Sequence, residues 1–342
     1  MIEASANNLG DTGAPDSVMA SGPLFVLGLW RSGTSLLYVL LNQHPQIALL
    51  YEADLPMLRP LFCVQRPKTR WLERWDFWND SVMKRHQLSA DNINPQSNGV
   101  RAATEAVYRS YAQAKGAVIW GEKSPNWCDD VSSVARDFPA ARFIVLWRSP
   151  VSIARSIARA AQKDRWFRRS GIMLRALLGC ERLRRECGRL LQTGIPVHQL
   201  CYDDMVRNPE GSMRAICEFL KVSFDPRMET LEGADRSTIP GGAQHEMVMG
   251  SEIVSNCDSK GVLSTEAEEK ILRYVRLWQD KYGDSWLLLK GLTAKPGNRP
   301  GKWEYLQDEL LYRLLRAWDF AGVAIYSYAP FWLLQAYRAM KT

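Results

Sequence analysis

One short stretch, residues 24–37 (LFVLGLWRSGTSLL), most constrains the fold, because it predicts a strand, a tight turn and the start of a helix. Four residues separate Gly28 from Gly33, and Thr34 follows, which nearly matches the Walker phosphate-loop pattern G-x4-G-K-[ST]. Threonine replaces the Walker lysine, and the cation Arg31 lies inside the loop. Inward N–H groups and the positive end of a helix favour an anion. We therefore expect a phosphate site; a plain strand-to-helix turn with a solvated arginine is the alternative.

Length and composition favour one large domain. With 342 residues, 46% hydrophobic and 24% charged, the chain can bury a core without disulfides, so a single α/β domain with insertions is preferred to two small domains. The formal net charge of +7 suits an anionic cofactor, an acidic substrate or a membrane surface. Seven cysteines without a C-x-x-C pair, and four isolated histidines, argue against a zinc site or a disulfide framework. No histidine is expected to act as a base or a ligand.

The two ends of the chain differ from the middle. Residues 1–22 are rich in small and polar side chains and lack the basic and apolar regions of a secretory signal, so they predict a disordered leader on a cytoplasmic enzyme. An α/β domain is expected at 23–290, a linker containing proline and glycine at 291–301, and an apolar helical tail at 302–342.

Four more apolar segments predict strands, at 47–51, 117–120, 142–147 and 196–201. Helical stretches alternate with the strands, which indicates a P-loop-type α/β fold: a mostly parallel sheet flanked by helices, with helical insertions. Each strand is followed by a polar residue able to meet an anion or a hydroxyl, namely Arg31, Glu52, Lys123, Arg148 and Tyr202. Ligands of parallel sheets gather outside the carboxyl ends of the strands, so we expect these five residues at one edge.

The insertions are expected to hold the acceptor. Residues 55–117 predict no strand, and Trp71, Trp75 and Trp78 have the spacing of an amphipathic helix that packs in the core or as a lid. A second stretch is strongly basic, with Lys163, Arg165, Arg168, Arg169, Arg175, Arg182, Arg184, Arg185 and Arg189. A solvated helical face explains these charges; if functional, they would steer an acidic acceptor.

The C-terminal part predicts helices. Residues 265–268 (TEAE) read as a capping box that opens a helix to about Tyr282. Residues 317–337 are apolar and aromatic, with Asp319 as the one charged side chain and Pro330 as an interruption. We expect an amphipathic helix that packs on the domain or makes peripheral contact with a membrane. A membrane-spanning anchor is the alternative.

Motifs spread over residues 24–221 carry a resemblance to one enzyme family. They are RSGTS at 31–35 with His-Pro at 44–45, Lys-Ser-Pro at 123–125, an arginine and a serine at 148 and 156, and YDDMV at 202–206. This combination resembles the sulfotransferases that use 3′-phosphoadenosine 5′-phosphosulfate (PAPS). The resemblance is greatest to the tyrosylprotein sulfotransferase branch and its bacterial relatives.

The resemblance implies a role for each matching residue. Glu52 would be the catalytic base, and Lys123 and Arg31 would stabilise the transition state. The 5′-phosphosulfate would be bound by Arg31, Ser32, Gly33, Thr34 and Ser35. The 3′-phosphate and the nucleotide would be bound by Arg148, Ser156, Tyr202 and Lys260. No metal is expected, because a phosphosulfate needs no metal clamp.

The implied reaction is in-line sulfuryl transfer to a hydroxyl. A peptide or protein tyrosine, in an acidic peptide, is the first candidate acceptor; a carbohydrate, lipid or small-molecule hydroxyl is the alternative. Asp54 departs from the tyrosylprotein branch, which tends to have arginine two residues after the base.

Two other classes compete with this interpretation. A P-loop kinase or NTPase would use the Walker lysine and a strand-end aspartate to hold Mg²⁺, whereas this chain has Thr34 and Arg148 at those places. A basic peripheral binding protein would use the arginines of 163–189 on a phosphate-rich or membrane surface. No nucleic-acid-binding module is recognisable, so nucleic acid is not expected as a partner.

Overall fold

The computed structural model describes residues 22–58, 68–79, 81–94, 99–128, 130–168, 171–242, 245–254, 263–283 and 299–340. Three predictions fall wholly or mostly outside these ranges: the leader at 1–22, the linker at 291–301 and the binding role of Lys260.

Five parallel strands form one sheet in the order β2-β3-β1-β4-β5. The strands are β1 (Leu24–Leu27), β2 (Ile47–Tyr51), β3 (Ile119–Lys123), β4 (Arg142–Trp147) and β5 (Val197–Cys201). The predicted parallel α/β sheet is confirmed. The fully buried strand β1 is the central one. The turn that follows it therefore lies in the middle of the sheet's carboxyl edge.

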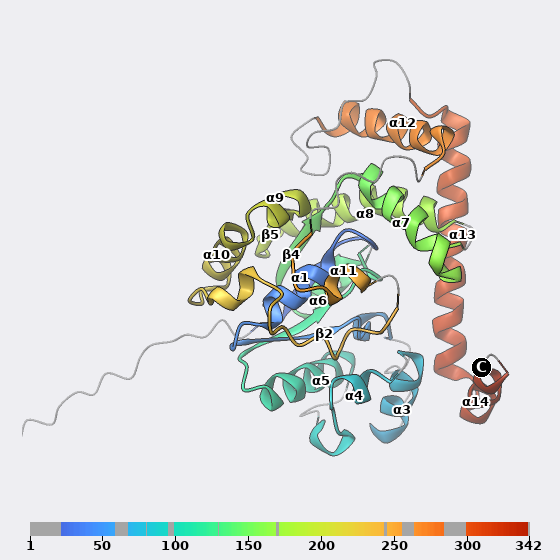
Figure 1. The fold of residues 1–342 in the computed structure, drawn as a ribbon. Helices are drawn as coiled ribbons and strands as arrows, with labels where there is room; N and C mark the ends of the chain where they lie inside the picture. Colours follow the sequence, from blue (N-terminus) through green and yellow to red (C-terminus); the bar gives the residue numbers. More distant parts are fainter. Residues whose placement is uncertain are drawn as a thin grey trace, which may run out of the picture.

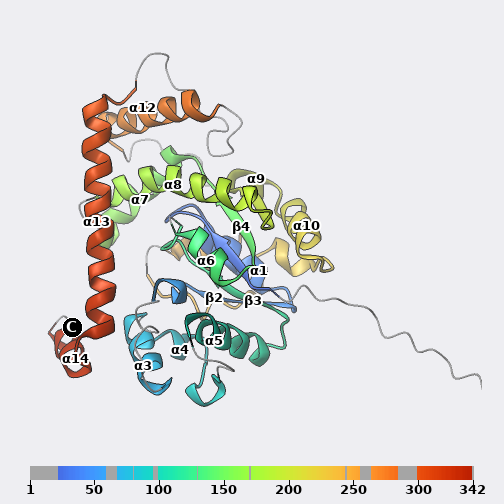
Figure 2. The ribbon, with the colours of Figure 1, turned by 180° about the vertical axis from the view of Figure 1, so that it is seen from behind.

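Successive side chains of β1 point to opposite faces and enter two separate cores. Phe25 and Leu27 pack with helices α3, α5, α6, α7, α8 and α12, whereas Leu24 and Val26 pack with α1, α9, α10 and α11. Figures 1 and 2, seen from opposite sides, show most of these helices beside the sheet, with α12 on the outer side of α7 and α8. The helices are α1 (Thr34–Asn42), α3 (Lys68–Trp78), α4 (Val82–Arg85), α5 (Val100–Ala114), α6 (Val131–Asp137), α7 (Pro150–Lys163), α8 (Ile172–Gln192), α9 (Tyr202–Arg207), α10 (Pro209–Leu220), α11 (Glu246–Met249) and α12 (Thr265–Tyr282). Short 3-10 turns lie at Leu55–Leu58, Ala90–Asn92, Arg165–Arg168 and Pro226–Glu229.

Three predicted boundaries were wrong, and one of them is the start of the fifth strand, which begins at Val197 instead of residue 196. The third strand does not run over 117–120 but extends to Lys123, because the polar pair Glu122 and Lys123 is fully buried and pairs with neighbouring strands. Helix α12 is capped one residue earlier than expected, since the Ser264 side chain accepts the N–H of Ala267 at 3.2 Å.

The tryptophan helix and the tail helices form as the periodicity indicates. In α3, Trp71 and Trp75 are buried in the core. The tail forms α13 (Lys302–Tyr328) and α14 (Phe331–Ala339), with the break at Pro330. Helix α13 runs along one side of the molecule, from α12 past α7 and α8 to α3 (Figure 1). None of the helices in the described ranges has both the length and the apolar character needed to cross a bilayer.

Candidate active site

Glu52 and Lys123 meet because β2 and β3 are neighbours in the sheet. The register pairs Tyr51 with Lys123, and the Glu52 N–H donates to the Lys123 carbonyl oxygen at 2.8 Å. The fully buried Lys123 Nζ lies 2.5 Å from Glu52 Oε1 and 3.4 Å from Ser35 Oγ. It also lies 3.8 Å from the centre of the Tyr51 ring. Burial lowers the pKa of Lys123, and the Glu52 carboxylate opposes this shift.

The turn after β1 brings its backbone close to other groups. A Cβ on Gly28 would lie 2.7 Å from Ser32 Oγ, and a Cβ on Gly33, whose φ is +100°, would lie 2.3 Å from the Tyr202 ring. Arg31 adopts a φ of 67° despite its side chain. Such backbone is retained where the surrounding structure enforces it, often at ligand sites. Ser32 Oγ is buried and has no hydrogen-bond partner among the described residues, so the loop has an unused polar atom for an anion.

Two arginines meet at this loop: Arg31, which belongs to it, and Arg148, which follows another strand. Arg148, directly after β4, donates to the Arg31 carbonyl oxygen at 2.9 Å, and its guanidinium lies 4.1 Å from the centre of the Tyr202 ring. Arg31 Nε donates to Ser156 Oγ of α7 at 3.0 Å. Burial, and then the charge of Arg148, lower the pKa of Arg31. Mutual repulsion of the two cations would be relieved by an anion bound next to both.

These residues line a cavity of about 740 Å³, here called the loop cavity. Its wall combines hydroxyl and guanidinium groups with apolar side chains, a combination that suits the phosphates and the base of a nucleotide. The lining residues are Arg31, Gly33, Thr34, Ser35, Leu36, Arg148, Ser152, Ser156, Arg159, Tyr202, Met247, Val248, Ile253 and Val254.

A second cavity, of about 910 Å³, contains Glu52 and is called the Glu52 cavity. It shares Arg31, Thr34 and Ser35 with the loop cavity, so the two spaces meet at the loop. Its other lining residues are Trp30, Glu52, Pro125, Asn126, Asp164, Phe167, Pro240 and His245. A ligand bound in the loop cavity and a ligand bound in the Glu52 cavity would therefore meet at the loop, near Glu52.

A family model described as "Sulfotransferase family" matches residues 23–226, a span that includes the loop and all five strand ends. The chain belongs to the sulfotransferase family. Membership implies PAPS as the sulfuryl donor and an acceptor substrate.

Two solved structures share the fold of this sulfotransferase. The sulfotransferase domain of the Synechococcus PCC 7002 olefin synthase is 18% identical, with a TM-score of 0.51, covering 85% of this chain and 94% of that one. The sulfotransferase domain from the curacin biosynthetic pathway is also 18% identical, with a TM-score of 0.50, covering 85% and 98%. No curated protein matches the sequence significantly.

Behind the Glu52 cavity, the sulfotransferase buries two carboxyl groups. Asp54 accepts hydrogen bonds from Ser124 Oγ and, at 2.8 Å, from Asn126 Nδ2. Glu122 accepts from Trp127 Nε1 at 2.6 Å. Burial raises the pKa of Asp54 to about 7 and that of Glu122 to about 8. A buried carboxyl in the neutral form avoids the cost of an unpaired charge.

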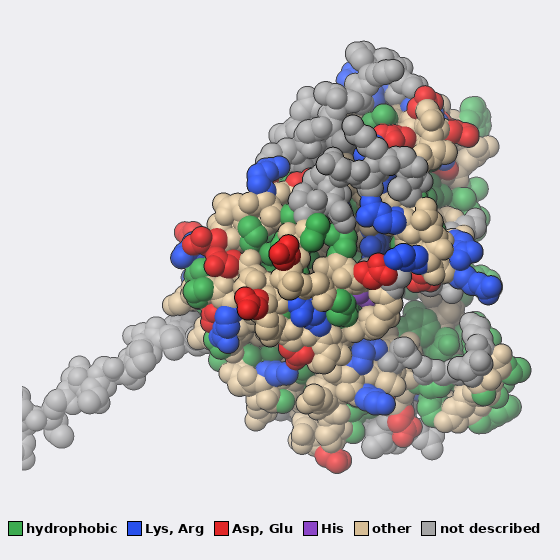
Figure 3. Space-filling view, in the orientation of Figure 1, with side chains coloured by type: hydrophobic (Ala, Val, Ile, Leu, Met, Phe, Trp, Pro, Cys, Tyr) green, Lys and Arg blue, Asp and Glu red, His purple; other side chains and the backbone are tan. Residues whose placement is uncertain are grey.

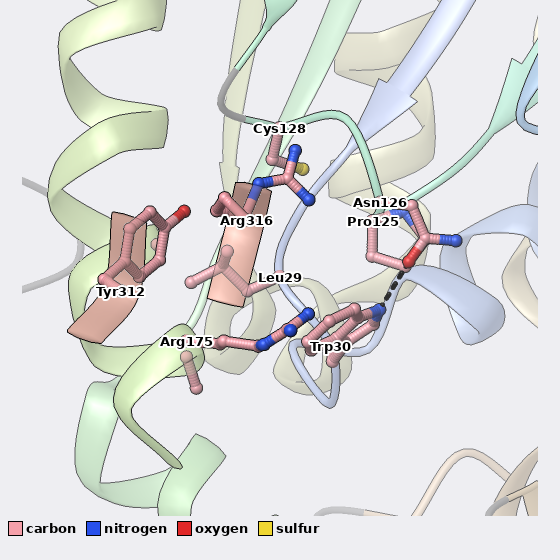
Figure 4. A pocket seen from close by; sticks show the side chains of 10 residues that line it. Leu29, Trp30, Pro125, Asn126, Cys128, Arg175, Tyr312 and Arg316 are labelled. Carbon is pink, nitrogen blue, oxygen red and sulfur yellow. Dashed lines mark hydrogen bonds between the residues drawn. The ribbon is translucent and has the colours of Figure 1, made fainter. Parts of the chain in front are cut away.

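A third cavity, of about 410 Å³, lies between the domain and α13 (Figure 4). Tyr312 and Arg316 of α13 form one side of this cavity, and Trp30 and Asn126 lie on the other, joined by a hydrogen bond of 2.9 Å. Trp30, Pro125 and Asn126 also line the Glu52 cavity, so the third cavity adjoins it.

The structure brings together ten of the eleven residues predicted for the site; the eleventh, Lys260, lies outside the described ranges. The sequence did not indicate His245, which lines the Glu52 cavity. The centre of its ring lies 5.9 Å from the centre of the Tyr51 ring. Burial lowers the pKa of His245 to about 4, so the imidazole is neutral near pH 7. No sequence pattern points to His245, because its place depends on how the segment after α10 folds back.

Two arginines of the basic stretch 163–189 neither form a solvated helical face nor face the acceptor site. Arg175 pairs with Asp319 at 2.6 Å and Arg182 with Glu309 at 2.5 Å, both on α13. Arg184 lies over the Tyr282 ring. These side chains join α8 to the C-terminal helices, so Arg175 and Arg182 are structural contacts and not a solvated or acceptor-steering face.

Proposed function

We propose that this sulfotransferase transfers the sulfuryl group of PAPS to a hydroxyl held in the Glu52 cavity, with a peptide or protein tyrosine as the first candidate acceptor. The observation that carries the proposal is the contact of Glu52 with Lys123 where the two cavities meet. A base for the acceptor and a cation for the leaving group then occupy one place.

The loop cavity supplies suitable partners for the donor. Arg148 and Ser156 would hold the 3′-phosphate, and the loop from Ser32 to Ser35 would hold the 5′-phosphosulfate through backbone N–H groups at the start of α1. The unused Ser32 Oγ and the close-packed Gly33 support this assignment. PAPS supplies the sulfuryl group and leaves as adenosine 3′,5′-bisphosphate.

The chain's own residues would do two things during transfer: accept a proton and stabilise a developing charge. The acceptor oxygen forms its bond to sulfur as the bond from sulfur to the 5′-phosphate oxygen breaks, and Glu52 takes the acceptor proton. Lys123 and Arg31 meet the negative charge that develops on the leaving oxygen. Fixed cations aimed at developing charge lower the barrier without reorganising.

The walls of the Glu52 cavity favour a flat acceptor. Trp30, Phe167, Pro240 and the neutral ring of His245 supply ring surfaces in the cavity that contains Glu52. A phenol ring would pack on these rings, whereas Thr34, Ser35, Asn126 and Asp164 of the same wall would serve the hydroxyls of a sugar. The rings are the basis for placing tyrosine first. This supports a tyrosine acceptor; carbohydrate, lipid and small-phenol hydroxyls are the alternatives that the test must separate.

The test uses the full chain with radiolabelled PAPS and three acceptor groups: tyrosine peptides with and without flanking carboxylates, oligosaccharides, and hydroxylated lipids or phenols. We expect labelled tyrosine peptide and measurable binding of adenosine 3′,5′-bisphosphate by calorimetry. Binding without peptide labelling, but with labelling of another group, would overturn the acceptor assignment alone. Failure to bind the bisphosphate would overturn the whole proposal.

A further inference from the structure

Helix α13 carries its carboxylates toward the protein. Its four carboxylates are Glu304, Asp308, Glu309 and Asp319. All four are partly buried and pair with the domain side: Glu304 with Arg273 at 2.8 Å, Asp308 with Lys270 at 2.6 Å, Glu309 with Arg182 at 2.5 Å and Asp319 with Arg175 at 2.6 Å. An amphipathic helix of a water-surrounded protein normally has the opposite arrangement, with its polar face outward.

The end of the helix is fixed as well. Arg74 of α3 donates to the carbonyl oxygens of Tyr326 and Ala329 at 2.7 and 2.6 Å, which satisfies acceptors left open in the last turn. Because contacts occur near the start, middle and end of α13, the rotation of the helix about its axis is set by the domain. The same contacts therefore fix which side of α13 faces away from the domain.

That outer face is mainly apolar, with the exposed Gln307 as a polar residue within it. Trp303 and Trp318 are 77% and 78% exposed. The exposed apolar residues of α13 and α14 are Trp303, Leu306, Leu310, Leu311, Leu314, Trp318, Phe320, Ile325, Tyr328, Trp332, Leu333 and Tyr337. Side chains coloured as hydrophobic recur down the right margin of Figure 3, over α13 and α14. With about 1.5 Å per residue, the 27 residues of α13 carry this face for about 40 Å.

A seven-residue repeat of exposed apolar residues, which a coiled coil needs, covers only part of the helix. Leu311, Trp318 and Ile325 have this spacing, but the same position one repeat earlier is Glu304, which pairs with Arg273. The repeat is therefore shorter than the three to four heptads that indicate a coiled coil.

The chemistry of the face suits the surface of a bilayer. Its tryptophans and tyrosines are the side chains that favour the membrane interface, because they combine an apolar ring with a polar group. None of the four carboxylates is on the exposed face, whereas Lys302 and Arg313 are exposed beside it. A net charge of +7 adds attraction to anionic lipid.

From this arrangement we propose that the outer face of α13 and α14 binds the headgroup region of an anionic lipid bilayer, with the helices lying parallel to its plane. The binding needs neither donor nor acceptor, so it stands apart from the proposed reaction. A second copy of the chain covering the same face is the competing occupant.

The test is flotation of the full-length protein with vesicles of phosphatidylcholine containing phosphatidylglycerol. The variant L310Q/L314Q/W318Q removes three exposed apolar side chains without touching the ion pairs. The matched control V118Q/L191Q changes two exposed apolar residues elsewhere on the surface. We expect the wild type and the control to float, and the triple variant to bind at least tenfold more weakly, since each side chain loses burial in lipid. Tryptophan emission should shift to shorter wavelength only for the binders.

Circular dichroism and binding of adenosine 3′,5′-bisphosphate show whether the triple variant is folded. Loss of flotation with intact bisphosphate binding supports the proposal. Wild-type protein that stays with the soluble fraction at every lipid composition would overturn it. A wild-type dimer by light scattering that becomes monomeric in the triple variant, without vesicle binding, would assign the face to a second copy.

Discussion

The Lys123 ammonium lies 2.5 Å from Glu52 Oε1, and the two residues belong to adjacent strand ends whose register is fixed by the pairing of Tyr51 with Lys123. The contact orients the carboxylate toward the cavity it shares with Arg31. It depends on backbone pairing between the edge strand β2 and its neighbour β3, so conservative changes at either side chain should leave the fold intact.

The first prediction concerns the base. Glu52→Gln keeps an oxygen that can accept the hydrogen bond from Lys123 but cannot take a proton. We expect the turnover rate to fall by roughly 10²–10⁴, with binding of adenosine 3′,5′-bisphosphate unchanged. Steady-state kinetics with labelled PAPS and calorimetry measure the two quantities. Glu210→Gln, on the exposed surface of α10, is the matched control and should behave as wild type. Near wild-type turnover of Glu52→Gln would remove Glu52 from the mechanism.

The second prediction concerns the 3′-phosphate. Arg148→Lys keeps the positive charge but loses the planar group that contacts both the Arg31 carbonyl oxygen and the Tyr202 ring. We expect the affinity for adenosine 3′,5′-bisphosphate to fall roughly ten- to a hundredfold, the range for a lost hydrogen bond to a charged group. The affinity for adenosine 5′-monophosphate should fall much less. Equal losses for both nucleotides would place the 3′-phosphate elsewhere. Arg214→Lys on α10 is the control.

The third prediction tests the close packing of the loop. Gly33→Ala puts a Cβ 2.3 Å from the Tyr202 ring at a φ of +100°. Gly116→Ala, at a φ of +67° with no atom within 4 Å, carries the backbone cost alone. A side chain in this backbone region costs about 1–3 kcal/mol, so urea unfolding should show that loss for Gly116→Ala and a larger one for Gly33→Ala. In the Gly33→Ala background, Tyr202→Ala should recover part of the difference. Equal losses for the two glycines would contradict the contact.

The fourth prediction follows from the buried carboxyl of Glu122. Burial raises its pKa from 4.5 to about 8, so between these values the folded protein holds a proton that the unfolded chain has released. The contribution to stability is complete below pH 4.5 and is lost as the pH rises through 8. Glu122→Gln cannot titrate. Between pH 5 and pH 8, the free energy of unfolding of the wild type should therefore fall by about 3 kcal/mol relative to that of Glu122→Gln. Urea unfolding at both pH values measures this, and parallel pH profiles would exclude it.

The order of strands, turns and cations could be predicted from the sequence because each is a local pattern. Gly28 and Gly33 mark the turn, and an apolar run precedes each polar strand end. The end of β3 was harder, because Glu122 and Lys123 read as loop residues while both are fully buried. Their burial depends on hydrogen bonds from Trp127 and to Glu52, which no local pattern encodes.

Two other features depend on contacts far apart in the chain. His245 reaches the Glu52 cavity through the segment that follows α10, and the rotation of α13 is set by Arg175, Arg182 and Arg74 from other helices. The sequence shows an apolar stretch at 317–337 with Asp319 as its one charged residue, preceded by a segment of mixed apolar and charged residues. It does not show which side faces the domain, because that choice is made by ion pairs whose partners lie more than a hundred residues away.

Three residues near the proposed site, Arg31, Glu52 and Asp54, adopt left-handed backbone although they carry side chains. At such positions, the residue that suits the proposed activity is not the one that suits stability. Glycine at any of these positions would relax the chain locally. Selection for heat resistance alone would therefore drift toward glycine at 31 and 52, whereas the roles in turnover that we propose for Arg31 and Glu52 would hold the larger residues in place. The Asp54 side chain is held in addition by its hydrogen bonds with Ser124 and Asn126.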